Sequence, residues 1–295
     1  MSPVRYRITH TTRYRYTTPV TLCHNEARLT PADGGRQVRR RSVFTIEPSP
    51  KLFDERTDYF GNRVTYFGVE VPHAHLTVTV VSEVVTEAAP TQLPLGADLA
   101  WEEVRERVRA AGDPELRTLH QYVLGSPLAA PAPTLRAYGL RSFTPGRSLM
   151  EATADLMHRI HGDFAYDPTA TSVSTPLARV WEERRGVCQD FAHLAIAVLR
   201  SLQLPAGYVS GYLETLPPPG QPKLVGADAS HAWFAAYLPD VGWVEFDPTN
   251  DQMPTEQYVV VARGRDYADV APLKGVIYGG GAHDMRISVD VRNLE

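Results

Sequence analysis

The first third of the chain alternates between apolar and polar residues, which is the pattern of β-strands. The alternation is clearest in Tyr6 to His10, Val43 to Ile46 and Leu76 to Val81. Turn-forming residues separate these runs, as in the proline- and glycine-containing stretch Pro31 to Gly35. The pattern predicts an N-terminal antiparallel β-sandwich-like domain over residues 1–88.

The alternation stops near Glu87, and a segment rich in alanine, proline and glutamine follows, which is typical of a linker. Beyond it, Trp101 to Ala111 and Pro114 to Leu124 have helical patterns. We interpret residues 89–145 as a helical connector between two domains.

The next part of the chain has the spacing of longer helices. Apolar residues recur on one face from Leu149 to Gly162, and Ser148 is placed to cap this helix with Glu151 three residues on. A second helix begins at Cys188, carries apolar residues at i, i+3, i+4 and i+7, and ends before Pro205. The breadth of its apolar face predicts a buried helix.

Strand patterns return after Pro205, in Gly207 to Leu213, His231 to Leu238 and Gly242 to Asp247. A last strand, Met285 to Val291, follows three glycines. The fold class predicted is α+β, with a core domain at residues 146–265 and a C-terminal Gly-rich loop and strand at 266–295.

Composition narrows the function classes. The chain has 295 residues, 43% of them hydrophobic, and a formal net charge of −4, so neither nucleic acid nor an anionic membrane surface is an expected partner. No uncharged apolar run approaches the roughly 18 residues of a membrane-spanning helix. Because the N-terminus also lacks the apolar run of a secretory signal, we expect a cytoplasmic protein.

Two cysteines, Cys23 and Cys188, are too few for a disulfide framework and fit a reducing compartment. Cys23 reads as a small packing residue. Cys188 begins the predicted buried helix, where unpaired N–H groups and the helix dipole favour an anion, and Arg184 and Arg185 add positive charge. This is a setting in which a cysteine becomes a nucleophile, although a cysteine in an apolar helix is more often a packing residue.

A base and an orienting carboxylate follow in the predicted strands. His231 opens one strand and Asp247 ends the next, so an antiparallel pair would bring the two side chains together. The carboxylate would hold the imidazole in one tautomer. The backbone N–H of Cys188 would stabilise an oxyanion, with Trp181, Gln189 or Tyr166 as candidates for the second donor.

A metal site is the rival chemical interpretation, because His73 and His75 are two residues apart and His158 and His161 are three apart. Neither pair has the companion cysteines or carboxylates of a zinc motif. We therefore expect no metal and no cofactor.

Four blocks of sequence carry a resemblance to a known family: Arg185 to Leu194, Tyr208 to Tyr212, Gly226 to Trp233 and Gly242 to Asn250. In these blocks the chain closely resembles the transglutaminase-like core of bacterial proteins, in a cysteine protease family with a papain-like fold. The first half resembles the bacterial transglutaminase-like β domain that precedes this core, through Tyr6 to Tyr16 and Asp58 to Asn62.

The resemblance implies a Cys-His-Asp triad, which falls on Cys188, His231 and Asp247. It also implies acyl transfer through a thioester, on a peptide or protein substrate, and association with peptide-ligase or proteasome-like proteins. Hydrolysis of a peptide or isopeptide bond is the expected outcome, since the proline-rich loop at 216–228 is typical of a stiff groove rim. The alternatives are crosslinking by amine transfer, with Trp233, Trp243 and Tyr212 lining an amine tunnel, and a non-catalytic peptide-binding module.

Overall fold

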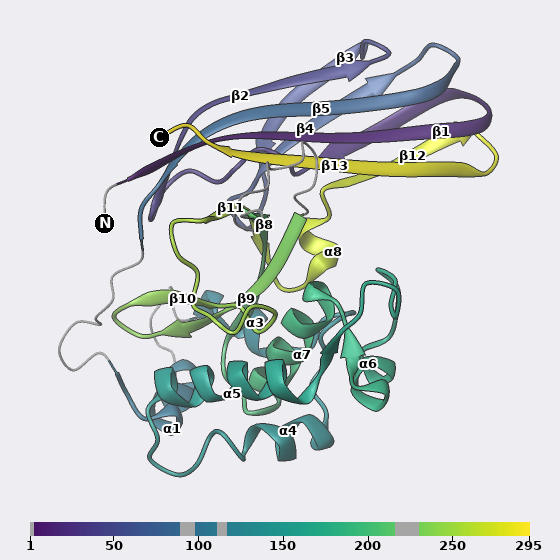
Figure 1. Ribbon diagram of the computed structural model, residues 1–295. Coiled ribbons are helices and arrows are strands. Elements are labelled where there is room, and N and C mark those ends of the chain that lie inside the picture. The colour runs from purple at the N-terminus through teal and green to yellow at the C-terminus, as the bar shows by residue number, and fades with distance from the viewer. Residues whose placement is uncertain (1–2, 89–97, 111–116, 216–229) are drawn as a thin grey trace, which may run out of the picture.

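The computed structural model describes residues 3–88, 98–110, 117–215 and 230–295. Figure 1 shows one large antiparallel sheet above a second part that contains the helices and a smaller sheet. The α+β class predicted from the sequence is confirmed.

The large sheet has seven strands in the order β2-β5-β1-β4-β3, with β12 and β13 also paired to β1. Its strands are β1 (Val4–Ala27), β2 (Gln37–Glu47), β3 (Leu52–Thr57), β4 (Arg63–Val69), β5 (His73–Thr86), β12 (Leu273–Gly279) and β13 (His283–Asn293). The C-terminal residues therefore return to the strand with which the chain begins, and the sequence alone gave no sign of that pairing.

The long strand β1 has two halves with different neighbours. Residues Tyr6 to Tyr16 pair with β13 and most of them also with β5, whereas Val20 to Ala27 pair with β12 and partly with β4. A single buried cluster takes residues from both halves, from β2, β4 and β5, and from Leu29 beyond β1. The sheet is thus a half-barrel curved around its own core, which gives the domain its sandwich-like character.

Cys23 lies in this core and is fully buried. Burial raises the pKa of its thiol, as expected for a packing cysteine in apolar surroundings.

Helices connect the sheet to the second part. They are α1 (Trp101–Arg109), α3 (His120–Val123), α4 (Pro133–Gly139) and α5 (Leu149–Asp163). The hydroxyl of Ser148 accepts a hydrogen bond from the N–H of Glu151 at 3.1 Å, so the predicted cap of α5 is present. Within the described residues the second predicted connector helix contains α3, and it ends before Leu124, whose backbone is extended.

The second part centres on helix α7 (Cys188–Ser201), preceded by β6 (Ala165–Tyr166), α6 (Leu177–Glu183) and β7 (Arg185–Gly186). A four-stranded sheet packs against α7 in the order β10-β9-β8-β11. Its strands are β8 (Ala206–Leu213), β9 (Ser230–Leu238), β10 (Gly242–Phe246) and β11 (Tyr258–Gly264), and α8 (Tyr267–Val270) follows. As predicted, α7 is buried along most of its length, since it is covered by the sheet on one side and by helices on the other.

The two parts are joined by polar contacts as well as by apolar packing. The Gln37 side chain bonds both the N–H and the carbonyl oxygen of Val260 on β11, each at 2.8 Å. The Tyr212 hydroxyl on β8 bonds His10 of β1 at 3.0 Å. The large sheet is therefore docked directly on the sheet that carries the candidate histidine.

No helix in the described ranges is long and apolar enough to cross a membrane. The predicted linker beyond residue 88 and the proline-rich loop at 216–228 lie outside the described residues.

Candidate active site

The start of helix α7 is fixed by the side chain of Asp190. Its Oδ2 accepts hydrogen bonds from the Val187 N–H at 2.8 Å and from the Thr171 hydroxyl at 2.6 Å. A Cβ atom at Gly186 would lie 2.8 Å from the same oxygen, so this position requires glycine. The backbone that presents Cys188 is thereby held in one geometry.

Cys188 is partly exposed at the first position of α7, and it is a free cysteine. Its side chain is a hydrogen-bond partner of His231. His231, near the beginning of β9, bonds Asp247 through Nε2 at 2.7 Å, which leaves Nδ1 as the ring nitrogen for the thiol. The structure thus brings together all three residues that the sequence singled out.

Asp247 is fully buried and its carboxylate is saturated with donors. Besides His231, Oδ2 accepts hydrogen bonds from the Tyr258 hydroxyl and from the Asn250 side-chain amide, each at 2.7 Å. Oδ1 accepts from the N–H of Thr249 at 2.9 Å. Burial alone would raise the pKa of Asp247, but these bonds outweigh it and hold that pKa below its usual value.

The surroundings of His231 favour its charged form. Burial opposes protonation, but the hydrogen bonds to Asp247 and Cys188 outweigh it and raise the pKa of His231 to about 10. At neutral pH the imidazolium therefore lies between a buried carboxylate and the sulfur.

A network of side chains from β9, β10 and β11, which Arg36 of the N-terminal part joins, lies beside His231. The Trp233 ring stacks on His231 with 5.8 Å between centroids, and its indole N–H donates to Glu245 at 3.0 Å. Glu245 also pairs with Arg263 at 2.6 Å and with Arg36 at 3.3 Å. Burial would raise the pKa of Glu245, but Arg263 and Arg36 outweigh it and lower that pKa.

The sequence did not single out Tyr258 or Arg36, and Glu245 stood out only as part of the block Gly242 to Asn250. Asn250 stands in a block that resembles the family, but its bond to Asp247 could not be read from the sequence. Tyr258 gave no signal that separates it from a packing aromatic on a strand.

The three candidates for a second oxyanion donor lie in different settings. Gln189 donates to the carbonyl oxygen of Val173 at 3.3 Å, and Trp181 packs among Tyr138, Phe164 and Arg184. Tyr166 is 55% exposed, and its pKa is raised by partial burial and by the charge of Cys188. The electrostatic interaction of Tyr166 with Cys188 keeps the Tyr166 hydroxyl a candidate for this donor.

The histidines of the second pair, His158 and His161, bond to residues that follow Asp247. Among the described residues, no group of three or more His, Cys, Asp or Glu side chains has the geometry to hold an ion. His158 pairs with Asp251, and His161 bonds the carbonyl oxygens of Pro248 and Thr249. Both histidines therefore hold the loop that follows Asp247 against helix α5.

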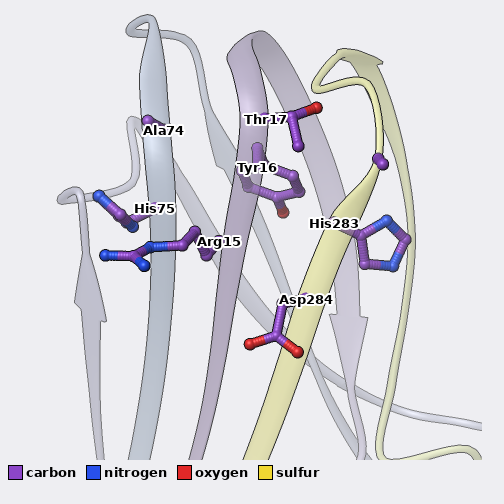
Figure 2. Close-up of a pocket in the computed structure, with 8 residues that line it drawn as sticks. Arg15, Tyr16, Thr17, Ala74, His75, His283 and Asp284 are labelled. Atoms are coloured by element: carbon purple, nitrogen blue, oxygen red, sulfur yellow. The ribbon is translucent and has the colours of Figure 1, made fainter.

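A hollow of about 500 Å³ lies elsewhere, on the large sheet, and no triad residue lines it. Its lining comes from β1, β5, β13 and their adjoining turns. Figure 2 shows Arg15 and His75 on one side and His283 on the other, without a common point of convergence. This hollow is therefore separate from the site around Cys188.

Comparisons with known proteins agree with this architecture. Residues 6–85 match the bacterial transglutaminase-like N-terminal region, and residues 140–248 match the transglutaminase-like superfamily. An uncharacterized protein of Mycobacterium tuberculosis strain H37Rv is 42% identical over 297 residues, covering 99% of this chain and 93% of the relative. An uncharacterized protein of Mycobacterium leprae is 37% identical over 295 residues, covering 98% and 99%.

Two further matches bear names that suggest chemistry for those proteins. A protein-glutamine gamma-glutamyltransferase of Pseudomonas aeruginosa is 34% identical over 150 residues, which cover 48% of this chain and 22% of that protein. A crystal structure of a candidate cysteine protease from Cytophaga hutchinsonii superimposes with a TM-score of 0.76 at 20% identity, covering 100% of this chain and 92% of that one. At this identity the second match shows a shared fold.

The two matched regions follow each other in the order in which the fold places them, and the mycobacterial relatives align over nearly their whole length. The chain therefore belongs to the transglutaminase-like superfamily, with a bacterial transglutaminase-like N-terminal region before its core.

Proposed function

We propose that the protein is a cysteine-dependent acyl-transfer enzyme that hydrolyses a peptide or isopeptide bond. The observation that carries the proposal is the position of His231, which bonds the buried carboxylate of Asp247 through one ring nitrogen and is a hydrogen-bond partner of the Cys188 thiol. This order of nucleophile, base and orienting acid is the arrangement of a catalytic triad.

In the first half-reaction the thiolate of Cys188 attacks the amide carbonyl carbon and forms a C–S bond. The His231 imidazolium gives its proton to the leaving nitrogen as the C–N bond breaks, so a thioester and a free amine result. The N–H of Cys188 at the start of α7 and the hydroxyl of Tyr166 are the donors we assign to the transient oxyanion.

In the second half-reaction water attacks the thioester carbon and neutral His231 takes a proton from it. The C–S bond breaks, a carboxylic acid leaves, and the thiolate–imidazolium pair is restored. Asp247 stays ionised throughout and stabilises the imidazolium.

The aromatic residues that an amine tunnel would need are engaged elsewhere, which favours water as the acceptor. Trp233 is fully buried with its indole N–H on Glu245, and Tyr212 is 2% exposed with its hydroxyl on His10. Trp243 packs edge-on against Tyr122 and Tyr237. A transferase must bind an amine or exclude water near the thioester, and these three side chains provide neither function.

Amine transfer is the second candidate function, because the Pseudomonas relative is named a protein-glutamine gamma-glutamyltransferase. Both candidates are tested together by incubating the enzyme with a glutamine-containing protein, a peptide library and a fluorescent primary amine. Mass spectrometry then follows cleavage and amine incorporation, with Cys188→Ala as the control. We expect cleavage that depends on Cys188; incorporation without cleavage would assign transfer, and no turnover by either variant would assign the non-catalytic module.

The hydroxyl of Tyr258 is expected to support the triad through Asp247. Tyr258→Phe keeps the buried ring but removes the 2.7 Å bond to the carboxylate, and a hydrogen bond to a charged group contributes about 1.5–3 kcal/mol. We expect kcat to fall by about tenfold with little change in KM. The matched control is Tyr66→Phe, which removes a hydroxyl bonded to His24 in the large sheet. Equal rates for Tyr258→Phe and this control would contradict the assigned role.

A further inference from the structure

Tyr208 is a buried tyrosine on β8, a strand that packs against the helix beginning with Cys188. Its ring lies on His193 of α7 with 4.9 Å between centroids, and edge-on against Tyr267 at 6.3 Å. His193 is itself fixed, because its Nε2 accepts a hydrogen bond from the Tyr267 N–H at 3.1 Å. The ring of Tyr208 is therefore held in one position against the N-terminal half of α7.

The hydroxyl of Tyr208 differs from those of other buried tyrosines. The hydroxyls of four of them bond a carboxylate or a histidine at 2.7 to 3.0 Å, namely those of Tyr6, Tyr138, Tyr212 and Tyr258. Within the described residues the Tyr208 hydroxyl forms no hydrogen bond, and it is not one of the fully enclosed polar atoms that lack a partner, so its oxygen stays accessible. A buried hydroxyl usually has a partner. This donor is therefore free for a group that a ligand brings.

The environment of this hydroxyl includes the candidate nucleophile. Burial raises the pKa of Tyr208 well above its ordinary value, and the charge of Cys188 is the next cause, with Asp190 adding to it. Cys188 and Asp190 both lie in the first turn of α7. The charge of Cys188 also raises the pKa of Tyr166. Two tyrosine hydroxyls thus lie near the sulfur, an exposed one from β6 and a buried one from β8.

Tyr212 shows the contrast on the same strand. It lies on the same face of β8 as Tyr208, belongs to the same core cluster and is equally buried, at 2% exposed. Its hydroxyl bonds His10 of the large sheet, and burial alone raises its pKa. The two hydroxyls therefore serve different purposes, and that of Tyr212 joins the two parts of the protein.

The group that a substrate brings to the sulfur is a carbonyl oxygen. When Cys188 attacks, that oxygen becomes negative while its carbon is bonded to the sulfur. Such a charge is stabilised most by donors that are in place before the reaction and lie where water is excluded. Tyr208 is 2% exposed and fixed by two rings, whereas Tyr166 is 55% exposed. Tyr208 meets both requirements.

We propose that the hydroxyl of Tyr208 is a further hydrogen-bond donor to the oxyanion that forms on Cys188. It acts together with the N–H of Cys188 and the hydroxyl of Tyr166, and it stabilises the transition state without affecting the reactivity of the thiol itself. This inference rests on the proposed acyl transfer at Cys188 and adds a catalytic residue to it.

Two reagents that modify the same sulfur separate these effects. With 4-nitrophenyl acetate the thiolate attacks the ester carbon, a C–S bond forms through a tetrahedral oxyanion, and 4-nitrophenolate leaves. With iodoacetamide the thiolate displaces iodide from a saturated carbon, and no oxyanion forms. The ratio of the two rates at Cys188 therefore measures oxyanion stabilisation without a natural substrate, and Cys188→Ala gives the background.

Tyr208→Phe keeps the ring and removes only the hydroxyl. We expect the acetylation rate of Cys188 to fall at least about tenfold, while its alkylation rate stays at the wild-type value. The matched control, Tyr212→Phe, is expected to leave both rates unchanged. Equal acetylation rates in the two variants would overturn the proposal. An equal fall of acetylation and alkylation in Tyr208→Phe would also overturn it, because the hydroxyl would then support the thiolate or the fold.

Failure of the proposed function has a different outcome in the same experiment. A wild-type alkylation rate no faster than that of N-acetylcysteine would show that Cys188 is not activated. An ordinary thiol still reacts with 4-nitrophenyl acetate, so the comparison of Tyr208→Phe with Tyr212→Phe would still decide the role of Tyr208.

Discussion

Replacing Cys188 with alanine is expected to abolish turnover and to leave the fold intact. The substitution removes one sulfur atom from a partly exposed position at the start of α7, while Asp190 still fixes the backbone there. Loss of a triad nucleophile typically lowers kcat by about 10⁴-fold or more. Cleavage of the peptide library measures the rate, and circular dichroism with thermal melting checks the fold.

The second cysteine supplies the control for this experiment. Cys23 is fully buried in the core of the large sheet, so Cys23→Ala is expected to lower stability by about 1 kcal/mol and to leave the rate unchanged. Activity lost in Cys23→Ala and retained in Cys188→Ala would refute the assignment of the nucleophile.

Removing the imidazole of His231 is expected to be about as damaging as removing the thiol, because nucleophile and base act as one unit. The pKa of His231 is raised to about 10, so the cation beside the sulfur persists from acid pH to about that value. The alkylation rate of Cys188 should therefore vary little between about pH 6 and pH 9 in the wild type. In His231→Ala it should fall steeply toward pH 6, as for an ordinary thiol of pKa about 8.5.

Asp247→Ala separates orientation from proton transfer. The imidazole remains, but it loses the carboxylate that fixes its tautomer, and a measurable residual rate is expected. A pH profile of alkylation that is the same in wild type and His231→Ala would show that the two side chains do not act as a pair.

The sequence predicted those features that depend on local chemistry. The apolar spacing after Cys188 predicted helix α7 and its burial. Ser148, with Glu151 three residues on, predicted the cap at the start of α5. Strands β9 and β10 were also expected, and the turn between them places His231 within reach of Asp247. In each case a short stretch of residues determines the structure.

Features that depend on distant parts of the chain could not be predicted. Alternation identified Met285 to Val291 as a strand, but nothing local shows that it pairs with β1, more than 250 positions earlier. The bond of Tyr258 to Asp247 and the pairing of Arg36 with Glu245 likewise require the packed sheets. A tyrosine or arginine in these roles has the same local pattern as one on any strand or turn.

The central claim, that Cys188 is a nucleophile activated by His231, is tested most directly by the second-order rate of its reaction with iodoacetamide at pH 6. Peptide mapping locates the label, and N-acetylcysteine under the same conditions gives the rate of an ordinary thiol. A free thiol of pKa about 8.5 is well under about 1% thiolate at this pH, whereas a thiolate–imidazolium pair is largely ionised. We predict that Cys188 reacts at least about tenfold faster than the free thiol, and a rate equal to or below that of the free thiol would contradict the claim.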